Sequence, residues 1–275
     1  MTQIILTGWT FYPSVLIGFG LWTIAYSAVT GYHPIRSGCG EPPTLLQQIA
    51  FHVGTFIGLI ALISPLDKLG DEYLFSAHMI QHLLLMFITA PLWLVGTPGW
   101  LIDLMIPVAF KKFARWITRP LPAFTVFTGA MLAWHSPFLY NLAQDNEAIH
   151  IFEHLTFIGA ALIGWWPVAA SESISISLPT PPVRMLYLFL LGIPMTALSA
   201  ILTFSSAALY PFYLEAPRLF AGFNALDDQR LGALLMWVPM HMVLFLALGI
   251  TFHQWLVSEE RQVDESLYAN SLSRS

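Results

Sequence analysis

The sequence predicts an all-α membrane protein, a seven-transmembrane-helix bundle with its N-terminus outside and its C-terminus cytoplasmic. Hydrophobic residues make up 56% of the 275 residues and charged residues only 10%, and the mean hydropathy is +0.67. These values are typical of chains that reside in lipid and lie outside the range of soluble domains. Seven apolar segments of spanning length, and a bias of basic residues to one side, complete the prediction.

The composition also excludes other classes of protein. The formal net charge is -5, and the chain has no basic patch or stripe of the kind that binds nucleic acid, so we expect no nucleic-acid partner. The only cysteine is Cys39. A single thiol excludes an internal disulfide and any paired-thiol redox motif.

A membrane span needs about 20 mostly apolar residues to cross about 30 Å of hydrocarbon. Seven segments meet this requirement, at about residues 11–31, 45–65, 74–96, 120–140, 149–169, 183–207 and 232–256. They predict a single transmembrane domain over residues 1–257 that contacts the lipid bilayer along its length. The remaining residues, 258–275, predict a polar, disordered cytoplasmic tail.

Between the third and fourth spans, the segment from about residue 100 to 116 predicts an interfacial helix, whose basic residues Lys111, Lys112 and Arg115, with Arg119 just after it, face lipid headgroups. The positive-inside rule then sets the orientation, because an outer N-terminus leaves eight basic residues inside and three outside. The inner residues are Arg36, Lys111, Lys112, Arg115, Arg119, Arg184, Arg261 and Arg274, and the outer ones are Lys68, Arg218 and Arg230.

Five of the nine histidines are expected at one depth, near the outer ends of three spans. His78 and His82 begin the third span, His150 and His154 begin the fifth, and His135 lies late in the fourth. Residues four apart on a helix differ by about 40° in direction, so each H-x-x-x-H pair faces one way. A lone buried histidine often only hydrogen-bonds a neighbouring helix. Five at one depth favour a shared polar or metal-binding site over that structural role.

The ligand types favour copper, with zinc as the alternative, and leave the choice of metal open. Imidazole binds copper, zinc, iron and nickel, whereas thioether sulfur favours Cu(I). Further candidates, as ligands or as partners that orient a ligand, are Glu153, Met79, Met86 and His241. A carboxylate beside a ligating histidine can fix its tautomer, and methionine is also a common filler of apolar cores.

Three blocks of the chain resemble the CtaG-like cytochrome c oxidase assembly factors of the seven-span integral membrane type. The blocks are FSAHMIQHLLLMFITAPLWLVGTP, AWHSPFLYNLAQDNEAIHIFEHLTFIGAALIGWWPV and DDQRLGALLMWVP. The similarity covers roughly residues 45–257. In the last span, Met240 and His241 replace the small residues usual in that family, so His241 is either an extra ligand or a substitution without a role.

The resemblance implies a multi-pass protein of the bacterial cytoplasmic (inner) membrane that helps to mature a haem-copper terminal oxidase of the respiratory chain. It implies a chaperone and not an enzyme, with the oxidase subunits and a periplasmic copper donor as partners. Copper, more than haem, is the implied cofactor. The histidines that match the family blocks are His78, His82, His135, His150 and His154.

Three other hypotheses remain open from the sequence. A di-iron membrane oxygenase is suggested by H-x-x-x-H beside Glu153, although the H-x-x-H-H boxes of membrane desaturases are missing. A haem-binding redox protein could use His82 and His154 as axial ligands. A metal-free structural chaperone of the oxidase would use its histidines only to hold helices together.

Overall fold

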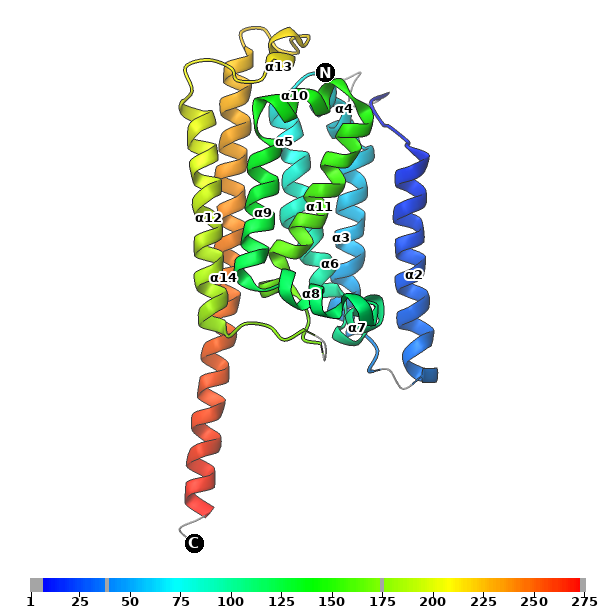
Figure 1. The fold of residues 1–275 in the computed structure, drawn as a ribbon, viewed down its shortest axis with the longest axis vertical. Coiled ribbons are helices and arrows are strands. Elements are labelled where there is room, and N and C mark those ends of the chain that lie inside the picture. Colours follow the sequence, from blue (N-terminus) through cyan, green and yellow to red (C-terminus); the bar gives the residue numbers. More distant parts are fainter. Residues whose placement is uncertain (1–6, 38–39, 174–175, 273–275) are drawn as a thin grey trace.

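The computed structural model describes residues 7–37, 40–173 and 176–272, and Cys39 and Arg274 lie outside the described residues. Every regular element in these ranges is a helix, and the long helices run side by side in an elongated bundle (Figure 1). Six of them are long and apolar enough to cross a membrane. The prediction of an all-α membrane protein is therefore confirmed.

The helices follow one another in a simple order along the chain. They are α2 (Pro13–Ser37), α3 (Leu45–Ile63), α4 (Pro65–Glu72), α5 (Phe75–Leu83), the π-helix η1 (Leu84–Thr89), α6 (Ala90–Gly96), α7 (Gly99–Met105), the 3₁₀-helix η2 (Val108–Phe110), α8 (Lys111–Ile117), α9 (Pro120–Trp134), α10 (Pro137–Asp145), α11 (Glu147–Ala169), α12 (Pro181–Phe204), α13 (Pro211–Glu215) and α14 (Ala225–Leu272). The six candidate spans are α2, α3, the unit α5–η1–α6, α11, α12 and α14.

The third predicted span contains a π-helical segment directly after its two histidines. η1 follows His82 by two residues, and π turns inside helices are frequent at functional sites. Trp165 of α11 donates a hydrogen bond from Nε1 to the carbonyl of Met86 in this segment, at 2.9 Å. Met86 itself is buried among apolar side chains.

The fourth predicted span is divided in the structure. α9 ends at Trp134 and α10 begins at Pro137, because a proline has no N–H to donate and disfavours helical geometry in the residue before it. With 15 residues, α9 is about 22 Å long, shorter than the hydrocarbon core. The count of seven spans therefore stays a prediction.

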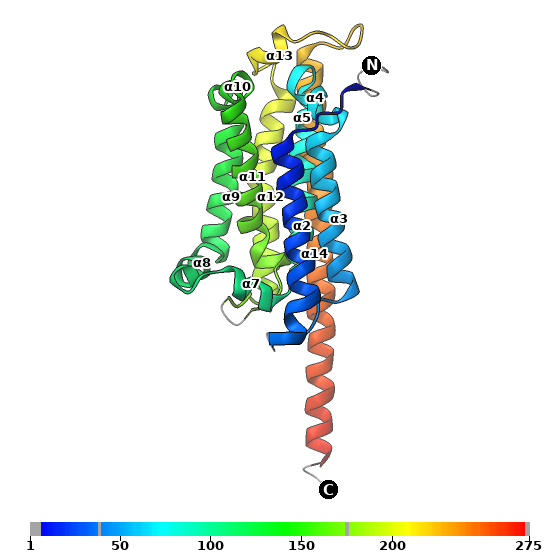
Figure 2. The same cartoon turned by 90° about the vertical axis from the view of Figure 1, so that its right-hand side faces the viewer.

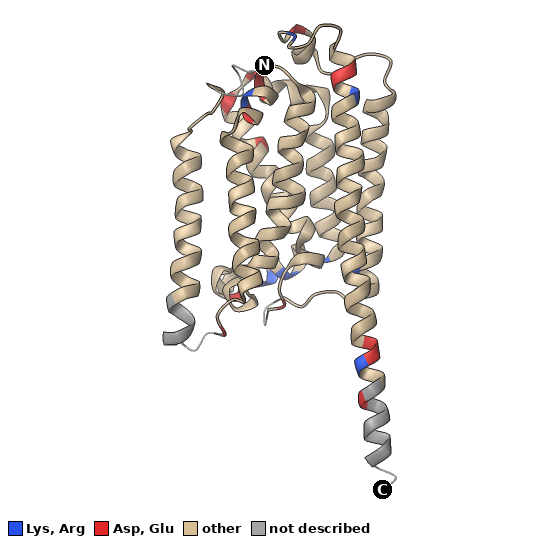
Figure 3. Cartoon of the chain, turned by 180° about the vertical axis from the view of Figure 1, so that it is seen from behind, with Lys and Arg blue, Asp and Glu red and all other residues tan. Residues whose placement is uncertain are grey.

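The two ends of the bundle differ in character. The start of α2, together with α4, α10 and α13, lies at one end, whereas α7, α8 and the C-terminal part of α14 lie at the other (Figures 1 and 2). The second end carries the basic residues of α8, including Lys111, Lys112 and Arg115 (Figure 3). In place of one interfacial helix over residues 100–116, the structure has the three short helices α7, η2 and α8 there.

The tail differs from the predicted disorder. α14 continues as a helix to Leu272 and projects beyond the bundle (Figure 2). Residues 258–272 extend an existing helix and so avoid the cost of a new nucleus. Their sequence is also rich in Glu, Arg, Gln and Leu, which favour helix.

Apolar packing joins the central helices. The main buried cluster contains side chains of α5, α9, α11, α12 and α14, among them Phe127, Phe157 and Leu191. α2 lies at the edge and packs on α3, where Tyr26 stacks on Phe51 with ring centroids 3.6 Å apart. The core therefore holds α5, α9 and α11 together, and these are the three helices that carry the predicted site.

Candidate metal centre at one end of the bundle

Five histidines converge at the end of the bundle that α4 and α10 cover. His78 and His82 come from α5, His135 follows the last residue of α9, and His150 and His154 come from α11. The ring centroids of His78 and His82 are 4.2 Å apart, and those of His150 and His154 are 4.5 Å apart. Between helices, the His78–His150 distance is 5.5 Å and the His82–His154 distance is 5.3 Å. The ring of His135 lies 6.5 Å from that of His82.

Most of the imidazole nitrogens in this cluster have no hydrogen-bond partner. The unpaired buried nitrogens are His78 Nε2, His82 Nδ1 and Nε2, His135 Nε2, His150 Nε2 and His154 Nε2. Buried polar atoms are nearly always hydrogen-bonded, because leaving them unpaired costs free energy. A bound ion would supply the missing partner to several of these nitrogens at once.

Glu153 lies where the sequence predicted an accessory group. Both of its carboxylate oxygens are buried without a hydrogen-bond partner. The ligand atoms of Glu153, His78 and His82 all lie within 4.8 Å of one another. Imidazole and carboxylate groups at this spacing are typical ligands of copper and zinc.

A second carboxylate, Asp71 of α4, also belongs to the cluster. Its Oδ1 lies 3.7 Å from His78 Nδ1 and 3.7 Å from His150 Nε2. Burial, with a smaller contribution from the charge of Glu72, raises the pKa of this carboxyl to about 6, although a charge on His150 opposes the shift. Sequence patterns do not single out Asp71, because it looks like one more acidic residue between two predicted spans.

A glycine allows α4 to reach the histidines. A Cβ added to Gly70 would lie 2.9 Å from Cα of His78, so any side chain at this position would push α4 away from α5. Tyr213 of α13 donates a hydrogen bond to the Gly70 carbonyl at 2.7 Å and fixes this approach from the other side. Asp71 thus faces the cluster because its neighbour has no side chain.

The tautomer of His135 is fixed by a hydrogen bond that leaves one ring nitrogen free to bind an ion. Its Nδ1 lies 2.8 Å from the carbonyl of Met131, and since a carbonyl can only accept, Nδ1 carries the proton. The lone pair is therefore on Nε2, which has no partner, as in histidines whose tautomer is fixed before they bind a metal. Tyr210 donates to the His135 carbonyl at 3.0 Å and holds the end of α9.

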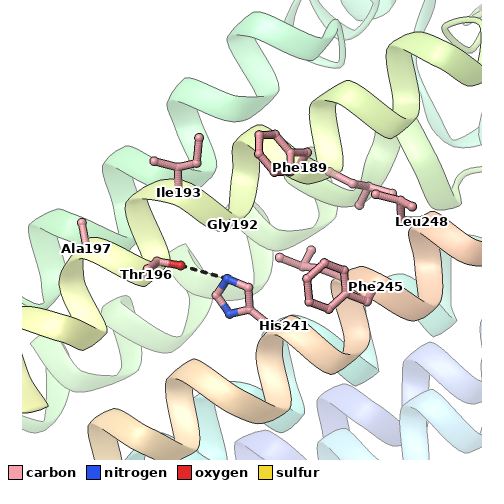
Figure 4. Close-up of a pocket in the computed structure, with 10 residues that line it drawn as sticks. Phe189, Gly192, Ile193, Thr196, Ala197, His241, Phe245 and Leu248 are labelled. Atoms are coloured by element: carbon pink, nitrogen blue, oxygen red, sulfur yellow. Dashed lines mark hydrogen bonds between the residues drawn. The ribbon is translucent and has the colours of Figure 1, made fainter.

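Three further candidates from the sequence lie in other surroundings. Met79 and Met86 are buried in the main apolar cluster. His241 donates from Nδ1 to the carbonyl of Trp237 at 2.7 Å, and its Nε2 lies 2.9 Å from Oγ1 of Thr196 (Figure 4). It borders a cavity of about 350 Å³ between α12 and α14. The packing of α12 against α14 accounts for the contacts of His241 without a metal.

Comparison with known protein families identifies a match over most of the chain. The sequence model of the cytochrome c oxidase caa3 assembly factor family (Caa3_CtaG) matches residues 24–258. No curated protein and no solved structure matches the chain. The matched range runs from within α2 to within α14 and includes all five clustered histidines, Asp71 and Glu153. The chain therefore belongs to the cytochrome c oxidase caa3 assembly factor family.

Proposed function

We propose that this assembly factor binds a copper ion at the histidine cluster and passes it to a subunit of the oxidase. The observation that carries the proposal is the set of six buried imidazole nitrogens without hydrogen-bond partners, gathered from three helices. A purely structural role would use these nitrogens in hydrogen bonds between helices.

The ligand set and the client enzyme together favour copper. Imidazole and carboxylate groups suit zinc as well as copper. Met79 and Met86 pack in the apolar core, so their thioether sulfur gives no further reason to prefer copper over zinc. The resemblance described above implies a haem-copper oxidase as the client, and copper is then the ion that the client requires.

The placement of the cluster supports delivery on the extracytoplasmic side. The basic helix α8 lies at the opposite end of the bundle from α4 and α10 (Figures 1 and 3), and basic segments favour the cytoplasmic face. The ion would leave by exchange of its imidazole ligands for those of the acceptor. No substrate is converted in such a transfer, in keeping with an assembly role rather than an enzymatic one.

Metal content of the purified protein tests the proposal directly. The full chain, purified in detergent, is loaded with Cu(I) under reducing conditions, washed and analysed by mass spectrometry. The test variant carries alanine at His78, His82, His150 and His154, and the matched control carries alanine at His52 and His253, which are exposed and outside the cluster. Helix content and elution volume confirm that all three proteins are folded.

Near-stoichiometric copper is expected in the wild type and the control, and none in the test variant. Copper in none of the three would overturn copper handling and leave an assembly factor that acts through protein contacts. An absorption band of haem in the wild type would favour a haem-binding role instead. In cells, His78→Ala with His82→Ala should leave the oxidase protein present but deficient in copper, and normal oxidase activity would contradict the proposal.

A further inference from the structure

The two carboxylates divide the cluster into two groups of ligands that share one histidine. Asp71, His78 and His150 form one group, and His78, His82 and Glu153 form the other. We propose that these groups are two successive positions for a copper ion, an outer position and an inner position, and that the ion passes from the first to the second through His78. This inference rests on the proposed function and specifies the route within the same site.

Each group is compact enough to hold an ion. Within each, the ligand atoms of all three residues lie within 4.8 Å of one another, a spacing that a small closing movement converts to the two-ångström bonds of copper or zinc. The two groups differ in every residue except His78. Both groups draw on α5 and α11, whereas α4 contributes only to the outer group.

The exposure of the ligand side chains determines which of the two positions an ion from solvent reaches first. The side chains of Asp71 and His150 are 26% and 15% exposed, whereas that of His78 is 0% exposed. In the inner group, Glu153 is only 1% exposed and His82 only 4%. An ion from solvent therefore meets the outer position first, where a partly hydrated carboxylate can replace some of its water. The inner position is dry, and an ion there exchanges more slowly.

The two ring nitrogens of His78 explain how it can serve both positions. Nδ1 lies 3.7 Å from Asp71 Oδ1 and 3.4 Å from Gln144 Nε2, on the outer side. Nε2 is buried without a partner and is the nitrogen left for the inner group. A neutral imidazole has one lone pair and one N–H, so the positions are filled one at a time. The ring proton moves from Nε2 to Nδ1 as the ion moves inward, with no net gain or loss of protons.

Glu153 and Asp71 then have separate roles, which substitutions can distinguish. Asp71 lies at the outer position and governs how fast an ion is taken up. Glu153 lies at the inner position and governs how firmly the ion is held. Glu72 provides a matched control, because it is also a carboxylate of α4 but is 51% exposed and pairs with Lys68 at 3.7 Å.

The experiment measures uptake and release of Cu(I) by the full chain in detergent. Cu(I) is presented as a complex with a coloured chelator, and loss of colour after rapid mixing gives the rate of uptake. Return of colour after excess chelator is added gives the rate of release. The proteins compared are wild type, Asp71→Asn, Glu153→Gln and Glu72→Gln, each checked by elution volume for folding.

Asp71→Asn should slow uptake and release alike by about 10–100-fold, the cost of losing a metal-site partner, because the ion passes the outer position in both directions. The affinity, and so the copper held at equilibrium, should match the wild type. Glu153→Gln should take up copper at the wild-type rate and release it about 10–100-fold faster. Glu72→Gln should match the wild type in both rates. Uptake by Asp71→Asn at the wild-type rate would overturn the two-position route. The same pattern of rate changes in Asp71→Asn and Glu153→Gln would also overturn it, because it indicates a single site. Absence of copper from the wild type would instead overturn the proposed function itself.

Discussion

Oδ1 of Asp228 accepts a hydrogen bond from the backbone N–H of Ser76 at 3.1 Å, across 152 residues of sequence. Oδ2 of the same carboxylate accepts from the backbone N–H of Phe75 at 2.6 Å. The residue before α5, Leu74, provides no side-chain cap. The carboxylate of α14 therefore caps the helix that carries His78 and His82, and satisfies two N–H groups that every helix start leaves free.

Loss of this cap is expected to destabilise the protein. Asp228→Ala removes both hydrogen bonds, and loss of a helix cap costs about 0.5–2 kcal/mol of folding free energy. Thermal unfolding in detergent, followed by circular dichroism, should show a lower midpoint. Asp227→Ala is the control, since Asp227 bonds only the nearby Asn224. Equal midpoints for the two variants would contradict the capping role.

The close approach of α4 to α5 predicts a large effect of one methyl group. Gly70→Ala places a Cβ 2.9 Å from Cα of His78, so the backbones must separate, at a cost of about 1–3 kcal/mol. Because Asp71 moves with α4, uptake of Cu(I) should slow as well as stability fall. Gly129→Ala has no atom within 4 Å of the new Cβ and should lower neither. A stable Gly70→Ala protein with normal uptake would show that α4 is not held against His78.

Asp67 predicts a dependence of stability on pH. Burial, with the charge of Asp71, raises its pKa from 3.8 to about 7, although Thr10 and Gln81 donate hydrogen bonds to it. A carboxyl whose pKa is raised on folding contributes stability that is present below its unfolded pKa and is lost as pH rises through the folded one. The folded protein should thus lose stability between about pH 4 and about pH 7.

Asp67→Asn tests this dependence, because the amide stays neutral at every pH. The unfolding midpoint of the variant, relative to the wild type, should rise from about pH 4 to about pH 7 and stay level above that. Glu72→Gln removes a charge from the exposed side of the same helix and controls for general electrostatics. A constant difference between Asp67→Asn and wild type across this range would show that Asp67 does not titrate there.

Among single histidine substitutions, His78→Ala is expected to weaken copper binding most. His78 is common to both ligand groups, whereas His150 and His82 each belong to one. Competition with a Cu(I) chelator should show a loss of affinity greater than the ~10–100-fold that loss of a supporting partner causes. His253→Ala, at an exposed position away from the cluster, should bind as the wild type does. Equal affinities of the two variants would exclude His78 as a ligand.

The sequence by itself determined the class of the protein and the local geometry of its helices. Hydropathy is a property of neighbouring residues, so the long apolar segments were found close to their observed bounds. The spacing of His78 and His82, and of His150 and His154, is likewise local, because helix periodicity alone turns each pair to one face.

Only the tertiary structure decided which of these helices are neighbours and which distant residues complete the site. Asp71 joins the histidines because Gly70 lets α4 approach α5, and Asp228 caps α5 from a helix far along the chain. Met86 packs in the main apolar cluster, and the pairing of α12 with α14 gives His241 other partners. These outcomes depend on contacts between segments remote in sequence, and such contacts cannot be predicted from local periodicity.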